Sequence, residues 1–209
     1  RSGLMFSNDF VRGLAAGIAI PDIDTDTIIP IDYCVNRKRP HFDEGLFRAW
    51  RFNSDGGLRE DFILNDASYR GCKILVVGPN FGCGSSREMA VWALKDFGIF
   101  CVIAPSFGEI FYSNCFQNQV LAAKVSESAA TMLLKALDEN VGLVLDIDIE
   151  RNLIGSEVTQ SVEFELDALR KTMFLQGLDP IDATYSKDAD ISRFEEKYRA
   201  THSWVYEKE

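Results

Sequence analysis

The chain has 209 residues, of which 46% are hydrophobic, so it is long and apolar enough to build a buried core. Its formal net charge of −10 argues against a nucleic-acid-binding protein, because phosphate contacts need clustered Lys and Arg, and the one basic run, 37–39, is more typical of a solvated loop. No segment approaches the roughly 18 to 20 apolar residues of a membrane helix, and the N-terminus lacks a secretory pattern, so we expect a cytoplasmic protein without membrane contact.

The first third of the chain has the least regular pattern. Residues 13–31 contain short strand candidates, whereas residues 32–70 are rich in Arg, Gly, Asp and aromatic residues without a steady period. Long irregular segments in compact domains are usually functional or mobile. We therefore expect this part of the chain to be either functional or mobile.

The clearest architecture lies in the middle of the chain. Residues 73–78 form a short apolar run typical of a buried strand, and a glycine-rich turn, 79–85, follows it. Residues 87–97 have the spacing of a helix that ends at Gly98, and 99–104 form a second buried strand. This order predicts a parallel strand–helix–strand crossover and hence an α/β fold.

Helices and strands continue to alternate in the second half. The expected elements, in chain order, are a helix at 107–116, a strand at 120–125, a helix at 128–137, half-exposed strands at 143–149 and 161–166, a helix capped by Asp167 that ends near Gly177, and an amphipathic helix within 179–206.

The cysteines set limits on metal chemistry. There are five of them, Cys34, Cys72, Cys83, Cys101 and Cys115, without a Cys-x-x-Cys pair, and the chain has only two histidines. The odd, scattered set is typical of a reducing compartment. The chain alone therefore offers no convincing zinc or iron–sulfur ligand set.

The turn at 81–88, Phe-Gly-Cys-Gly-Ser-Ser-Arg-Glu, is a candidate anion site. Its glycines allow close approach of a ligand to the backbone, and N–H groups at the start of a helix favour negative charge. A purely structural alternative is a capping box made by Ser85 and Glu88. Three other functions are weaker alternatives. A dinucleotide-binding turn would have its third glycine where this chain has Arg87, and a phosphate-binding loop would end in Gly-Lys-Ser/Thr. A catalytic role for Cys83 as a nucleophile lacks an evident histidine partner.

Residues 80–88 closely resemble the active-site turn of the aconitase superfamily's swivelling domain, in particular that of 3-isopropylmalate dehydratase small subunits. Three further segments, 22–30, 45–51 and 105–116, resemble that family's other motifs in the same order. The resemblance extends from about residue 13 to about residue 199. It implies a single swivelling β/β/α domain over 1–209, like the aconitase C-terminal domain, with an irregular substrate loop at about 34–60 and a helical tail at about 179–209.

The resemblance also implies an activity and partners. It implies a hydro-lyase that interconverts 2- and 3-isopropylmalate, a small dicarboxylate substrate, and a large subunit that holds a 4Fe–4S cluster on its own cysteines. Removing a proton beside a carboxylate needs a base and a group that holds the developing charge, and a Lewis acid helps hydroxide to leave. This chain itself would bind no metal.

The resemblance assigns roles to five residues. Ser85 matches the catalytic base, which a helix N-terminus would stabilise as an alkoxide. Arg87 matches the arginine that binds a substrate carboxylate, and a planar guanidinium suits that task. Ser86, Thr25 and Asp26 match substrate-contacting positions, although an Asx turn is the structural alternative for Asp26.

Three departures from the family pattern concern the substrate. Met89 replaces a usual histidine, residues 119–122 replace a Gly-Leu-Leu-Pro-like stretch, and the segment 34–44 lacks an expected glycine-containing sequence. These changes leave the reaction class standing, but a relative acting on citraconate, 2-methylmalate or dimethylmalate stays an alternative. A non-catalytic subunit with the same fold is a third hypothesis, which the joint presence of Ser85 and Arg87 disfavours.

Overall fold

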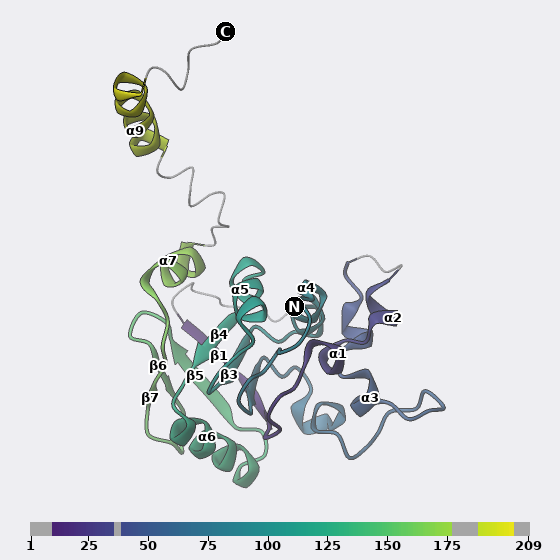
Figure 1. The fold of residues 1–209 in the computed structure, drawn as a ribbon. Helices are drawn as coiled ribbons and strands as arrows, with labels where there is room; N and C mark the ends of the chain where they lie inside the picture. Colours follow the sequence, from purple (N-terminus) through teal and green to yellow (C-terminus); the bar gives the residue numbers. More distant parts are fainter. Residues whose placement is uncertain (1–9, 36–38, 177–187, 203–209) are drawn as a thin grey trace, which may run out of the picture.

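The computed structural model describes residues 10–35, 39–176 and 188–202. Its centre is a seven-stranded sheet with the strand order β4-β3-β2-β1-β5-β6-β7 (Figure 1). The strands are β1 (Phe10–Ile18), β2 (Ile74–Val77), β3 (Cys101–Ala104), β4 (Leu121–Lys124), β5 (Val144–Asp148), β6 (Leu153–Gly155) and β7 (Val162–Glu163). The mixed sheet and its helices confirm the expected α/β fold class.

The half of the sheet from β4 to β1 is parallel, and its middle strands, β2 and β3, are buried on both faces. Every residue of β2 and β3 is buried, which explains why these strands read as unbroken apolar runs in the sequence. Helices α4 (Glu88–Phe97) and α5 (Glu109–Gln117) lie on one side of the sheet and α6 (Glu127–Glu139) on the other (Figure 1). Helix α4 ends at Gly98, whose φ of 105° confirms the predicted C-terminal glycine.

The other half of the sheet is antiparallel and curls back toward β4. Strand β5 pairs with β1, and β6 and β7 follow as a meander. Strand β6 was not predicted; it is three residues long and follows Asn152, which has a left-handed φ of 55°. Beyond β7, the backbone N–H of Glu165 donates to the carbonyl of Lys124 at 2.7 Å, so the two ends of the sheet meet.

The first third of the chain contains short helices rather than several short strands. The single strand β1 occupies part of the region 13–31, and the predicted series of short strands there is wrong. The other elements are α1 (Thr25–Ile28), α2 (Ile31–Cys34), α3 (Arg48–Arg51) and three 3₁₀ turns, η1 (Phe42–Gly45), η2 (Ile63–Asn65) and η3 (Ala67–Tyr69). Helices this short carry no periodicity that a sequence pattern can display.

The segment that precedes β2 is anchored to α4 and to itself. The carboxylate of Asp96 accepts hydrogen bonds from the backbone N–H groups of His41 and Phe42, both at 3.2 Å. The half-buried guanidinium of Arg51 donates to the carbonyls of Asp43, at 2.8 Å, and Leu46, at 3.3 Å. The expected irregular loop is therefore a set of short turns held by side chains.

The C-terminal part begins with α7 (Ala168–Gln176), and Asp167 accepts a hydrogen bond from the N–H of Arg170 at 2.9 Å, as predicted for its cap. Helix α9 (Asp188–Thr201) lies within the predicted tail. Gly177, the rest of the tail at 179–187 and 203–209, and residues 37 and 38 of the basic run lie outside the described residues. Among the helices described, none has the length and apolar content needed to cross a membrane.

Candidate functional site

Two segments far apart in the sequence lie side by side beyond the ends of β1 and β2. They are the segment 22–25 and the glycine-rich turn 79–83, and they extend the parallel pairing of the two strands. Three backbone hydrogen bonds join them: Asp22 N–H to the Pro79 carbonyl at 2.9 Å, Gly82 N–H to the Ile23 carbonyl at 2.7 Å, and Thr25 N–H to the Cys83 carbonyl at 3.0 Å. This pairing fixes where the side chains after each strand are placed.

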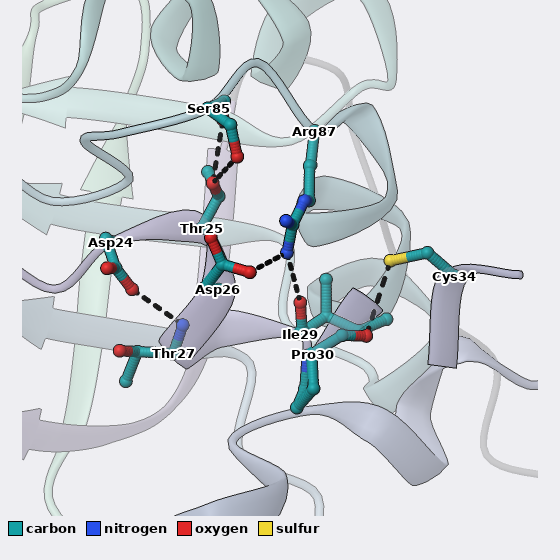
Figure 2. A network of polar contacts seen from close by, with 9 residues as sticks. All are labelled: Asp24, Thr25, Asp26, Thr27, Ile29, Pro30, Cys34, Ser85 and Arg87. Carbon is teal, nitrogen blue, oxygen red and sulfur yellow. Dashed lines mark hydrogen bonds and ion pairs between the residues drawn. The ribbon is translucent and has the colours of Figure 1, made fainter. Parts of the chain in front are cut away.

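Thr25 and Ser85 meet at the end of this pairing. The Thr25 hydroxyl donates to the Ser85 carbonyl at 2.7 Å and lies 3.3 Å from the Ser85 hydroxyl oxygen (Figure 2). Because Thr25 has one hydroxyl proton and gives it to the carbonyl, the Ser85 hydroxyl is the donor in the second contact. Thr25 is only 1% exposed, whereas Ser85 is exposed, so a rigid buried residue orients an accessible hydroxyl.

Arg87 and Asp26 form an ion pair beside the two hydroxyls. The Arg87 guanidinium donates to Asp26 and, at 3.3 Å, to the carbonyl of Ile29, so its side chain crosses from the turn to the segment of α1 (Figure 2). The Arg87 side chain is 17% exposed and that of Asp26 is 56% exposed. Arg87 is thus held in place with part of its guanidinium open to a ligand, and the alternative role of Asp26 in an Asx turn is replaced by this pair.

Ser86, the fifth predicted residue, is exposed on the same turn. Within the described part of the chain, no hydrogen bond from its hydroxyl is found. The structure therefore brings Thr25, Asp26, Ser85 and Arg87 together, and it leaves Ser86 at the rim of the group.

The relation of Ser85 to α4 differs from the expectation. The helix begins at Glu88 and Arg87 is its N-cap without a side-chain cap bond, so Ser85 lies before the cap. The capping box of Ser85 and Glu88 is wrong, and so is the placement of Ser85 at the helix N-terminus. The field of a helix end falls off within about one turn. Charge on the Ser85 oxygen would thus be stabilised mainly by Thr25 and the nearby Arg87.

Two glycines of the turn have a positive φ, and at one of them there is also no room for a side chain. Gly84 has φ of 87°, and Gly82 has φ of 72° with no room for a side chain, since a Cβ there would lie 2.2 Å from Cγ of Phe111. Phe111 is buried, and its ring packs edge-to-face on Phe81 at 5.3 Å between centroids. The path of the turn toward Ser85 is therefore set by contact with α5.

Replacing Gly82 with alanine is expected to lower the free energy of unfolding by about 3 kcal/mol, from left-handed strain plus overpacking against Phe111. Chemical denaturation of the isolated chain measures this. Gly56 is the matched control, because it has a φ of 86° and a Cβ added there would meet none of the described atoms within 4 Å, so Gly56→Ala isolates the strain, about 1 kcal/mol. Equal losses for the two variants would contradict the role of the Phe111 contact.

Asp24 belongs to the site's framework, although it was not among the predicted site residues. Its carboxylate caps α1 by accepting from the N–H of Thr27 at 2.7 Å. This hydrogen bond and the charge of Arg87 lower the pKa of Asp24, outweighing the effect of burial. An Asp three residues ahead of the capped N–H is a recognisable signal, but the family motif drew attention to Thr25 and Asp26 instead.

The lowered pKa of Asp24 gives a prediction of pH dependence. A carboxyl whose folded pKa is below its unfolded pKa adds stability above about pH 4, and that stability is lost as the pH falls through the folded value. Asp24→Asn keeps a capping side chain but removes this titration. We expect the difference in melting temperature between the wild type and Asp24→Asn to shrink between about pH 5 and pH 3. A constant difference would show that Asp24 does not titrate in this way.

The cysteines near the site are protonated thiols. Burial and the carboxylates of Asp24 and Asp22 raise the pKa of Cys83, and burial raises the pKa of Cys34. A reactive cysteine needs a lowered pKa, so the structure agrees with an inert Cys83. In the described ranges, no three His, Cys, Asp or Glu side chains are grouped so that they could hold a metal ion.

A sizeable cavity among the described residues lies elsewhere. A groove of about 870 Å³ opens between α6 and the ends of β1 and β2, with Leu134 and Val77 in its walls. None of the five predicted residues lines it. Ser85 and Ser86 are exposed and the Asp26 side chain is 56% exposed, so a second molecule would have to cover the candidate site to exclude water.

Comparison with known proteins identifies relatives over almost the whole chain. Residues 9–128 match the aconitase C-terminal domain family. Proteins named 3-isopropylmalate dehydratase small subunit from Rhizobium etli and Rhodopseudomonas palustris are 46% and 45% identical over 195 residues, which are 93% of this chain and 96% and 97% of theirs. The crystal structure of a 3-isopropylmalate dehydratase from Methanocaldococcus jannaschii superposes with a TM-score of 0.63 at 26% identity, covering 88% of this chain and 98% of that one.

Proposed function

Because the chain belongs to the aconitase C-terminal domain family and, within it, to the small subunits of 3-isopropylmalate dehydratase, we propose that it supplies the base and the carboxylate-binding arginine of that enzyme. The enzyme is a hydro-lyase of leucine biosynthesis, and a small subunit implies a large-subunit partner. The observation that carries the proposed roles is the meeting of Thr25 with Ser85 and of Asp26 with Arg87, across about 60 residues of sequence.

We assign proton abstraction to Ser85. The proton beside a carboxylate is weakly acidic, so the base must be strong and placed within hydrogen-bond reach of the substrate carbon. Ser85 is exposed while its hydroxyl is oriented by the buried Thr25. The base is the Ser85 alkoxide, so the Ser85 hydroxyl must first lose its proton to solvent. The Thr25 hydroxyl can then rotate toward the charged oxygen, and the positive charge of Arg87 stabilises it until it takes the proton from the substrate carbon.

We assign substrate binding to Arg87, with Asp26 as its counter-ion. A guanidinium has five N–H groups, and the contacts with Asp26 and Ile29 are both made through Nη1. The remaining donors can bind one carboxylate of a small dicarboxylate with two parallel hydrogen bonds. Ser86, exposed beside Arg87, is proposed to contact the same substrate.

Hydroxide departure needs a Lewis acid, which the family implies is an iron–sulfur cluster (4Fe–4S). The described residues of this chain do not fit such a cluster. Cys72, Cys101 and Cys115 are buried in the core, and burial raises the pKa of each thiol. Thiolates are the required ligands. We therefore assign the cluster to the large subunit.

We further propose that the domain spans 1–209 as one swivelling unit with its helical tail, and that the enzyme works in the cytoplasm.

We also propose that the segment 34–60 binds the side chain of the substrate. The segment begins at Cys34, the last residue of α2, and it lies near Arg87: burial raises the pKa of the Cys34 thiol, and the positive charge of Arg87 opposes this. Val35 of this segment is 54% exposed, and Ile31, which lies just before the segment on α2, is 50% exposed. These apolar side chains suit a branched aliphatic group.

The proposal is tested with the assembled enzyme. The chain would be co-produced with the large subunit from the same organism, the cluster reconstituted without oxygen, and the absorbance of the unsaturated intermediate followed. We expect turnover of isopropylmalate in the complex and none with this chain alone. Turnover of citraconate or dimethylmaleate in preference to isopropylmalate would overturn the substrate, and inactivity of a complex with an intact cluster would overturn the catalytic role.

A further inference from the structure

A buried asparagine joins the two helices behind the site. Asn118 is 9% exposed and lies at the end of α5. Its side-chain carbonyl accepts from Trp92 Nε1 at 2.9 Å, and its side-chain amide donates to Glu88 Oε1 at 2.8 Å and to the carbonyl of Asn114 at 3.0 Å. Its backbone carbonyl accepts from Lys95 Nζ at 2.6 Å. One residue thus satisfies partners along the whole length of α4.

Glu88 is the important partner, because it is the first residue of α4 and follows Arg87 directly. The N-terminus of α4 has no side-chain cap among the described residues, so its first turn is not fixed in the usual way. Instead, the Glu88 carboxylate is held against α5 by Asn118. This hydrogen bond fixes the first turn of α4 and with it the backbone direction from which the Arg87 side chain leaves.

We propose that Asn118 is a positioning residue for substrate binding, acting through Glu88 on Arg87. The inference rests on the carboxylate-binding role proposed above for Arg87. Asn118 touches neither Ser85 nor Arg87, and Ser85 lies on the turn before the helix. Loss of the Asn118–Glu88 hydrogen bond therefore changes the Michaelis constant for the dicarboxylate more than it changes the turnover number.

The hydrogen bond can be broken and rebuilt with reversed polarity. In Asn118→Asp, the acceptor for Trp92 stays, but the amide that donates to Glu88 and to the Asn114 carbonyl becomes a carboxylate, which repels Glu88. We expect KM to rise about tenfold, since a hydrogen bond to a charged group is lost and like charges oppose each other. In Glu88→Gln alone, the amide oxygen still accepts from Asn118, so KM stays within about twofold. In the double variant, the amide introduced at position 88 donates to the carboxylate introduced at position 118, and KM is expected to return to within about threefold of the wild type.

Assays use the complex with its large subunit, at a temperature where each variant is folded by circular dichroism. Asn140→Asp is the matched control, because this amide donates to the carbonyl of Ala136 at 2.8 Å at the end of α6, on the other side of the sheet. We expect it to leave KM unchanged. If Asn118→Asp does not fold, Glu88→Ala removes the same hydrogen bond from the half-buried side and should raise KM about fivefold.

A cycle with Arg87→Lys separates positioning from general destabilisation. If Asn118 acts through Arg87, then Asn118→Asp adds little to the KM already raised by Arg87→Lys. A further rise of about tenfold in that background, or a double variant with Glu88→Gln that fails to recover, would overturn the inference. If Arg87→Lys by itself leaves KM unchanged, the failure belongs to the proposed role of Arg87 instead.

Discussion

Replacing Ser85 with alanine is expected to lower the turnover number of the assembled dehydratase by about 10²- to 10⁴-fold, the usual contribution of a positioned general base. The Michaelis constant should change little, because Arg87 and its ion pair with Asp26 do not depend on the Ser85 hydroxyl. The physical reason is that Thr25 stays buried and ordered but has no hydroxyl to orient toward the substrate. Steady-state assays with isopropylmalate measure both constants.

Ser128→Ala is the control for this prediction. Ser128 is an exposed serine on α6, away from the candidate site, and its hydroxyl lies 3.0 Å from that of Ser126. We expect this variant to retain wild-type turnover. Ser85→Ala with unchanged turnover, in a complex with a full complement of cluster, would remove Ser85 from the mechanism and favour the hypothesis of a non-catalytic subunit.

Replacing Arg87 with lysine is expected to raise the Michaelis constant for isopropylmalate by about 10- to 100-fold, with a smaller loss in turnover. Lysine keeps the positive charge, but an ammonium cannot contact Asp26 and the Ile29 carbonyl and also present two parallel donors to a carboxylate. A charge-assisted hydrogen bond contributes about 1.5–3 kcal/mol, which corresponds to this range. Higher salt should not reverse the rise in the Michaelis constant, because what is lost is the planar pair of donors and not the positive charge.

Arg12→Lys is the matched control for Arg87→Lys. Arg12 lies on β1 and pairs with Asp146 on β5 at 3.0 Å, with its side chain 56% exposed. Exposed ion pairs of this kind contribute little, so the variant should have normal kinetics. Normal kinetics for Arg87→Lys as well would mean that the substrate carboxylate is bound by other groups.

The parallel half of the sheet could be predicted because its signal is local. Strands β2, β3 and β4 are buried on both faces and read as apolar runs, and α4 and α6 between or after them show clear helical spacing. The C-terminal glycine of α4 at Gly98 could also be predicted, since a residue with positive φ after a helix is usually glycine.

What escaped prediction depends on contacts between distant segments. Strand β6 has three residues, too few to show alternation, and it exists because β5 and β7 pair with its two edges. The capping box at Ser85 and Glu88 fits the local pattern, but Asn118, 30 residues further on, takes the Glu88 carboxylate. Glu88 thus bonds to a residue that is distant in sequence and not to the nearby Ser85, and the sequence around the turn does not indicate this.

The candidate site was predictable as a set of residues but not as an arrangement. The family motifs selected Thr25, Asp26, Ser85 and Arg87, and the structure brings these four together. The motifs did not indicate that Asp26 neutralises Arg87 or that Thr25 orients Ser85, because both contacts arise from the pairing of backbone segments beyond β1 and β2. That pairing continues the pairing of β1 with β2, and it determines where the motif residues are placed.

The contact between the two ends of the sheet affects how readily the unassembled subunit aggregates. Strands at the margins of a sheet display unpaired N–H and C=O groups, which invite another chain to add itself and so begin aggregation. Here the bridge between Lys124 and Glu165 occupies part of the margin of β4 with a later segment of the same chain. A protein that is completed only by a different polypeptide must remain in solution until that polypeptide arrives. Because the edge of β4 is partly paired within the chain, it is less available for pairing with a second copy of the same chain before the large subunit binds.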